Sequence, residues 1–287
     1  MLRCWIETEN NQKLELTQNS EYDVINIEGL NPVGATINTY KIGISDGEHY
    51  NSSYVNMRNI VLYIVPKNRA NNIETNRLAL YKYFRPKHKI RLYFQHNSRD
   101  VFIDGYVETV EIALYSQLEQ FQISVICPQP FFKQVSSTVV SLNQLESLFE
   151  FPFSIAQEGI EFSRFGQISE MKCNNNGEVE TGLIITIKAT GLAYGIGISL
   201  DRNSNFRLVE DLELNSGDTL VINTNKGEKS VTKIDSDGNI SNCINYVDTN
   251  SVWLTLETGQ HDISKVINFG YEHLVIEVEF YNLYIGL

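Results

Sequence analysis

The sequence is poor in cysteine, and its four cysteines stand far apart, at positions 4, 127, 173 and 243. They form no CxxC pair and have no histidine at ligand spacing. A disulfide framework or a structural zinc site needs cysteines at short, regular spacings. We therefore expect Cys4, Cys127, Cys173 and Cys243 to be buried free thiols, as in a protein of a reducing cytoplasm.

Long apolar runs are also missing. Residues 1–20 lack the basic start and the apolar stretch of a signal peptide. No run approaches the roughly 20 apolar residues of a membrane helix. We expect a protein without a signal peptide that is made in a cytoplasm, stays soluble and has no membrane partner.

Positive charge is scarce in the second half of the chain. Residues 1–136 contain 14 Lys and Arg and 14 Asp and Glu, whereas residues 137–287 contain 9 and 21, so the second half carries the whole net charge of −12. An acidic surface repels phosphate backbones, which makes sequence-specific nucleic acid a poor partner. Two interpretations of the acidic half stay open: it faces a different neighbour from the first half, or its charge only keeps it soluble.

Catalytic motifs are absent as well: there is no Walker loop, dinucleotide fingerprint, HExxH or GxSxG. The segment Asp235–Asn239 has the composition of a calcium loop. An EF-hand, however, needs glycine at position six and an acidic residue at position twelve. Counted from Asp235, Gly238 is at position four and Tyr246 at position twelve. We interpret the segment as a hairpin turn.

The five histidines also form no recognisable site. No two of them have metal-ligand spacing, and we expect surface positions for His49, His88, His96, His261 and His273. No paired carboxylate motif of a hydrolase is present. We therefore predict no enzyme, no catalytic residue, no metal ligand and no cofactor, and the sequence leaves any ligand-binding residues unknown.

Aromatic and branched residues are abundant, with 15 Tyr and 14 Phe, which favours strands. Short apolar segments alternate with turn signals rich in Gly, Asn and Asp, as in β-sandwiches. A length of 287 residues suits two domains. We predict a mainly β chain with an N-terminal domain at 1–136, a connector at 137–155 that includes a short helix at Ser141–Leu148, and a C-terminal domain at 156–287.

One helix is predicted in the first half. Asn71 and Glu74 have capping-box spacing, and Pro86 ends the segment. The apolar residues on its inner face would be Ile73, Leu80, Tyr81 and Phe84, with Leu78 at the margin.

A basic run overlaps this helix: Lys67, Arg69, Arg77, Lys82, Arg85, Lys87, Lys89 and Arg91. It is either the solvated face of the helix or a surface for an acidic neighbour or for DNA passing through a ring. Charge reversal at Lys82 and Lys87 that left DNA delivery intact would speak against the DNA interpretation.

Several segments together resemble the distal tail protein family of long-tailed phages of Gram-positive bacteria. In the first half they are Ile27–Pro32, Met57–Val61, Leu80–Lys87, Ile103–Glu108 and Ile123–Lys133, and in the second half Asn176–Gly182, Ser216–Val231 and Ser251–Leu256. Each is only a strand and a turn, but their order along nearly the whole chain is fairly specific.

The resemblance implies an N-terminal β-sandwich with one flanking helix and a galectin-like or carbohydrate-module-like C-terminal β-sandwich. It implies a homo-oligomeric ring, usually a hexamer, at the virion tail tip. The ring would be a structural hub that joins the tail tube, tape-measure and tail-associated proteins to a baseplate with its receptor-binding protein.

Direct binding of a host-surface carbohydrate is the alternative function, and a wall hydrolase is a third. A galectin stacks sugar on a tryptophan, and Trp253 is the only tryptophan of the second domain. It sits in mid-strand, which favours a core position over a sugar platform.

Overall fold

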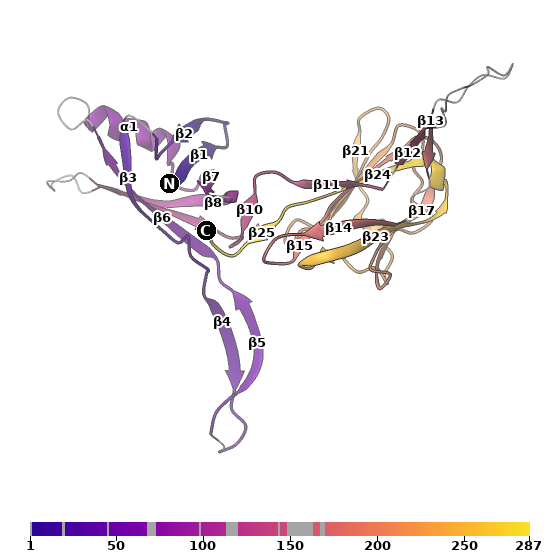
Figure 1. The fold of residues 1–287 in the computed structure, drawn as a ribbon, viewed down its shortest axis with the longest axis horizontal. Coiled ribbons are helices and arrows are strands. Elements are labelled where there is room, and N and C mark those ends of the chain that lie inside the picture. Colours follow the sequence, from indigo (N-terminus) through magenta and orange to yellow (C-terminus); the bar gives the residue numbers. More distant parts are fainter. Residues whose placement is uncertain are drawn as a thin grey trace. The chain divides into compact units, whose positions relative to one another are not determined.

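The computed structural model describes residues 2–18, 21–44, 46–67, 73–97, 99–112, 120–142, 144–147, 163–166 and 170–287 (Figure 1). The chain divides into two compact units. Unit 1 contains residues 1–135 and 283–287, and unit 2 contains residues 136–282. Unit 2 is therefore an insertion in unit 1. The expected C-terminal domain at 156–287 included the last five residues of the chain, but these residues belong to unit 1.

Unit 1 is built on one antiparallel sheet with the strand order β2-β1-β7-β8-β9-β6-β3. Two short strands extend it, since β10 pairs with β8 and β25 pairs with β10. The bounds are β1 Arg3–Thr8, β2 Lys13–Glu15, β3 Tyr22–Glu28, β6 Arg58–Pro66, β7 Lys89–His96, β8 Arg99–Ile112, β9 Phe121–Cys127, β10 Phe132–Gln134 and β25 Leu283–Tyr284. Alternate residues of these strands face the core, as Ile60, Leu62 and Ile64 do on β6.

Helix α1 (Ile73–Tyr83) covers this core and confirms the predicted helix. Leu80 and Phe84 are buried, but Tyr81 is exposed, so its predicted inward position is wrong. The inward line runs through Asn76, Leu80 and Phe84 at a spacing of four, and the carbonyl of Asn76 accepts a hydrogen bond from the Tyr22 hydroxyl (3.1 Å). The predicted cap Asn71 lies outside the described residues.

Arg58, the first residue of β6, is a buried cation in unit 1 and is only 1% exposed. It is stacked over the Phe132 ring, 4.4 Å from the ring centre. Its guanidinium donates to four backbone carbonyls from three separate parts of the chain, those of Gly29, Asn31 (2.8 Å), Pro130 (2.6 Å) and Ile285 (2.7 Å). Burial lowers the pKa of Arg58 from its ordinary value. The carbonyls take the place of water around the charge.

The C-terminal segment is fixed to unit 1 by further contacts. Arg99 donates to the Gly286 carbonyl and lies over the Tyr284 ring (4.7 Å). The Leu287 amide donates to the Leu30 carbonyl (3.1 Å). The segment that returns from unit 2 is thus held by two arginines and a strand pairing.

Unit 2 contains a six-stranded sheet, β11-β24-β16-β19-β20-β21, and a four-stranded sheet, β14-β23-β17-β18. Between them lies one apolar core that includes Ile187, Ile198, Phe206, Ile263 and Ile276. The strands of the first sheet are β11 Thr138–Ser141, β16 Ile184–Ala189, β19 Thr219–Asn223, β20 Ser230–Ile234, β21 Ile240–Asn242 and β24 Leu274–Phe280. Those of the second are β14 Glu170–Asn175, β17 Tyr194–Leu200, β18 Ser204–Arg207 and β23 Gly259–Phe269. A pair β15 (Thr181–Gly182) and β22 (Thr255–Leu256) and two 3-10 turns, η1 (Ile244–Tyr246) and η2 (Tyr271–His273), complete the unit.

The expected short helix at Ser141–Leu148 is wrong. Residues Gln144–Ser147 form strand β12, which pairs with β13 (Ser163–Gly166). A strand partner outweighs local helix propensity, which is a weak preference. The remainder of the expected connector, 148–155, lies outside the described residues. The mainly β fold class with one flanking helix is confirmed.

We expect Arg58→Met to destabilise unit 1 by about 3 kcal/mol or more, because it leaves buried carbonyls without donors. Urea unfolding followed by Trp5 fluorescence in a Trp253→Phe background measures this. Arg85→Met is the matched control in the same unit: its side chain is exposed, and its effect should stay within about 0.5 kcal/mol. An Arg58→Met variant as stable as this control would contradict the structural role of Arg58.

Candidate functional site

A two-stranded arm leaves unit 1 between β3 and β6 (Figure 1). Its strands are β4 (Ala35–Tyr40) and β5 (His49–Val55), and they pair only with each other. Almost every residue of the two strands is exposed. The sequence has no signal for β5, because its residues are largely polar.

Both faces of the arm expose apolar side chains. One face, which we call the apolar face, has Ala35, Ile37 and Val55, with Ser53 opposite Ile37, and Ile37 is 64% exposed. The other face has Tyr54, which is 58% exposed. On the other face Asn38 donates to the Ser52 hydroxyl (3.0 Å). An isolated hairpin is only marginally stable in water, so these polar contacts help to keep it formed. The apolar face contacts no core in the described part of unit 1.

The basic run divides into paired and unpaired residues. Lys67 pairs with Asp23, Arg77 with Glu74, and Lys89 and Arg91 both with Asp104. In contrast, the side chains of Lys82, Arg85 and Lys87 are exposed and make no ion pair with any described residue. Both interpretations of the run, a solvated face or a surface for an acidic neighbour or DNA, stay open, and Arg69 lies outside the described residues.

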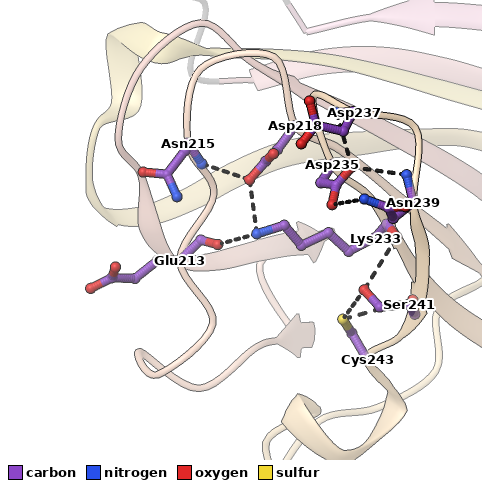
Figure 2. A network of polar contacts seen from close by, with 9 residues as sticks. All are labelled: Glu213, Asn215, Asp218, Lys233, Asp235, Asp237, Asn239, Ser241 and Cys243. Atoms are coloured by element: carbon purple, nitrogen blue, oxygen red, sulfur yellow. Dashed lines mark hydrogen bonds and ion pairs between the residues drawn. The ribbon is translucent and has the colours of Figure 1, made fainter.

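A polar network organises one end of unit 2 (Figure 2). The Lys233 ammonium lies 2.8 Å from the Asp218 carboxylate and donates to the Glu213 carbonyl (2.9 Å). Asp218 also accepts from the Asn215 amide (2.9 Å). Burial raises the pKa of Asp218, but these hydrogen bonds outweigh burial and hold its pKa below the ordinary value.

The turn Asp235–Asn239 is part of the same region (Figure 2). The Asp235 carboxylate accepts from the amides of Asp237 (3.0 Å) and Asn239 (2.8 Å), and Gly238 has a positive φ of 86°. Strands β20 and β21 pair across it, so the interpretation as a hairpin turn is confirmed. Among the residues that the structure describes, no cluster of His, Cys, Asp and Glu has the geometry of a metal site.

The histidines do not come together. His49 and His88 are exposed, and His96 and His273 are half-buried. His261 is also half-buried. One of its ring nitrogens lies 2.6 Å from Asp201 and the other 3.1 Å from the Glu257 carbonyl. All four cysteines are buried and free, as expected. Burial raises the pKa of Cys127 and Cys173 to about 12, so neither is a thiolate at neutral pH.

Trp253 packs against the core of unit 2, as the core interpretation expected, but it precedes β22, so its expected mid-strand position is wrong. Its ring lies 5.1 Å from that of Phe206, and the Lys229 ammonium is 5.3 Å from its centre. These neighbours occupy surfaces that a stacked sugar would need.

Lys265 is a lysine on the inner face of β23, between Ile263 and Ile267, and it is only 8% exposed. Its ammonium contacts the ring of Tyr271 (3.9 Å). Burial lowers the pKa of Lys265. This charge opposes folding of unit 2 instead of supporting it.

Two family models match the chain. The phage tail protein RIFT-related domain matches residues 9–127, and the siphovirus-type tail component, C-terminal domain, matches residues 176–280. The crystal structure of SPP1 Dit (gp 19.1), described as a hub of the adsorption apparatus in phages that infect Gram-positive bacteria, has a similar fold. Its TM-score is 0.67 at 10% identity, with 98% of each chain covered.

Chains of the phage P2 baseplate in its activated conformation are also similar in fold. With Ca the TM-score is 0.54 at 12% identity, with 98% of each chain covered. With Sr it is 0.51 at 12% identity, with 97% of this chain and 98% of that chain covered. No curated protein sequence matches this chain.

The two matched domains and the shared fold define a structural protein of a phage tail. The chain belongs to the siphovirus-type distal tail protein family, which confirms the resemblance seen in the sequence. It is a hub protein of the distal tail and baseplate, and the family is structural rather than enzymatic.

We expect Asp218→Asn to destabilise unit 2 by about 2 kcal/mol at neutral pH, because it removes the charge that Lys233 contacts. The folded pKa of Asp218 is lowered, so its contribution is present above the ordinary pKa of about 3.9 and is lost as the pH falls through the folded pKa. The wild-type and variant stabilities should therefore converge in acid. Chemical unfolding followed by Trp253 fluorescence checks this, with the exposed Asp237→Asn as control, and a difference that is independent of pH would refute it.

Lys265→Met should stabilise unit 2 by about 1 kcal/mol or more, because an apolar side chain replaces a desolvated ammonium. The folded pKa of Lys265 is lowered, so wild-type stability rises as the pH rises through that pKa. The stability gained by the substitution should therefore become smaller as the pH rises toward the ordinary lysine pKa of about 10.4. The control is Lys172→Met on an exposed position of β14, and an equal gain there would refute this role of Lys265.

Proposed function

We propose that this distal tail protein forms a closed ring of identical copies, with six as the expected number, at the end of a phage tail. The observation that carries the proposal is the arm β4–β5, whose apolar face has no covering surface in the described part of its own chain. Large exposed apolar surfaces mark interaction sites. Burying them against a second copy is worth about 25 cal/mol per Å².

The arm supports a ring better than it supports a symmetric dimer. We propose that the surface that covers it on the neighbouring copy is a different part of the chain. A contact between two different surfaces is head-to-tail, and head-to-tail contacts close into rings. Two arms that paired with each other would instead stop at a dimer.

In this proposal the ring joins the tail tube to the tail tip or baseplate. Its partners are the tail tube protein, the tape-measure and tail-associated proteins and the receptor-binding protein. The chain assembles in the host cytoplasm and has no catalytic activity. The neutral unit 1 forms the ring and the acidic unit 2 meets other tail proteins, an assignment supported by the position of the arm in unit 1.

We expect the double variant Ile37→Ser, Val55→Ser to weaken assembly by about 2 kcal/mol per contact, or roughly 30-fold, through lost apolar burial. Size-exclusion chromatography with light scattering across a concentration series measures the shift. The melting temperature of the monomer should not change, because neither side chain contributes to the core of unit 1.

The control removes exposed apolar side chains of unit 2 instead, in the double variant Val139→Ser, Ile240→Ser. It should assemble like the wild type. A wild-type chain that stops at a dimer, or arm variants that assemble like the wild type, would contradict the proposed ring.

A further inference from the structure

The turn at the end of the arm exposes two isoleucines. Of this arm tip, which joins β4 to β5, the structure describes residues 41–44 and 46–48. Ile42 is 53% exposed, and Ile44 is exposed over its whole side chain. The turn has a defined shape, because Gly43 has a positive φ of 62°, which glycine adopts without strain. Two exposed apolar side chains on a built turn form a candidate contact surface.

The arm tip also has a cation next to these isoleucines. Lys41 is exposed and makes no ion pair with any described residue. Glu48, on the other side of the turn, accepts a hydrogen bond from the Thr39 hydroxyl, so its carboxylate is already bound within the arm. Asp46 is exposed as well and would repel an anionic membrane. The arm tip therefore suits a protein surface that combines an apolar wall with a carboxylate near Lys41.

Unit 1 has a pocket of about 500 Å³ beside β3, within the range of roughly 300–1,000 Å³ that is usual for ligand sites. We call it the β3 pocket. Glu28 and His96 contribute polar groups to its wall. An apolar side chain that enters the pocket leaves water, because the rest of the wall has four half-buried apolar side chains, those of Leu2, Ile27, Leu30 and Leu287.

The wall of the β3 pocket is fixed by hydrogen bonds. The Arg58 guanidinium donates to the carbonyls of Gly29 and Asn31, which also line the pocket. The Leu287 amide donates to the Leu30 carbonyl (3.1 Å). A wall that is ordered in advance loses little conformational entropy when a partner binds.

The β3 pocket has a charge of opposite sign to that of Lys41. Glu28 is exposed and makes no ion pair within the described part of the chain. Its neighbour Tyr63 stays neutral, because partial burial and Glu28 itself raise the pKa of this phenol. Lys41 and Glu28 are thus unpaired charges of opposite sign, each next to apolar side chains.

A copy cannot fill the β3 pocket with its own arm tip. The pocket includes Asn31 at the root of the arm, and β4 lies between this root and the tip. The six residues of β4 are an extended strand that spans about 20 Å. The occupant therefore comes from another chain, and a second copy supplies a matching tip.

We propose that the β3 pocket of one copy receives the arm tip of the neighbouring copy. Ile42 and Ile44 pack on the apolar wall, and Lys41 pairs with Glu28. Both surfaces belong to unit 1. The contact joins two different surfaces, so it repeats head-to-tail and can close into a ring. It rests on the proposed ring and identifies one surface of the neighbouring copy that the arm contacts.

Charge exchange in the full chain tests this contact. K41E or E28K alone brings like charges together at every contact, so we expect a roughly tenfold higher concentration for half-maximal assembly at low salt. K41E and E28K combined in one chain should assemble like the wild type, because each contact again pairs opposite charges. Size-exclusion chromatography with light scattering measures all three variants. The controls K82E and E111K change exposed charges of unit 1 outside both surfaces and should assemble like the wild type.

Ile44→Ser tests the apolar part of the contact. It should weaken assembly roughly tenfold or more, because the pocket no longer buries this side chain. The melting temperature of the monomer should not change, since Ile44 is not part of the core of unit 1. The control is Leu78→Ser, which removes an apolar side chain that is 50% exposed on α1 and should assemble like the wild type.

The outcomes separate this docking from the ring itself. A wild-type ring with K41E, E28K and Ile44→Ser variants that assemble normally would overturn the docking and leave the ring standing. Single charge variants that fail and a combined variant that also fails, although it melts like the wild type, would overturn it too. So would an Ile44→Ser variant that assembles normally but loses binding to phosphatidylglycerol vesicles, because the tip would then contact a membrane. A wild-type chain that stays monomeric at every concentration would overturn both the docking and the ring.

Discussion

One buried guanidinium holds the distant segments of unit 1 together. The arm leaves the sheet after β3 and returns at Arg58, and the Arg58 side chain binds the carbonyls of Gly29 and Asn31 where the arm begins. Both roots of the arm are thus fixed at one point. An arginine suits this position because its planar guanidinium has five N–H donors that point in different directions. A lysine does not, because its three N–H donors share a single nitrogen.

The same side chain binds the Ile285 carbonyl, in the segment that returns from unit 2. The two peptide crossings between the units therefore end on β10 and β25, which pair with each other inside unit 1. Force applied to unit 2 therefore passes to the sheet of unit 1 through the paired strands β10 and β25, and not through an unpaired C-terminus.

The sequence was informative where one residue's chemistry decides the local structure. Alternating apolar residues located strands such as β6, and glycine and asparagine located turns such as Asp235–Asn239. It failed for β5, whose residues are exposed on both faces and so show no alternation, and for β12, whose strand partner is distant. The role of Arg58 had no sequence signal, because its partner Ile285 is 227 residues away. The arm needed exposure values that no sequence pattern supplies.

The division of charge gains a physical meaning from the structure. A chain with its net charge of −12 spread evenly would repel its own copies at every contact. In this chain the excess of acidic residues is confined to unit 2, whereas the arm belongs to unit 1, which has equal numbers of acidic and basic residues. Surfaces of the neutral unit 1 can approach one another without this electrostatic repulsion. The unpaired cations at the end of α1 attract only acidic surfaces. Segregated charge therefore disfavours the pairing of two acidic units and leaves contacts through unit 1 without this repulsion.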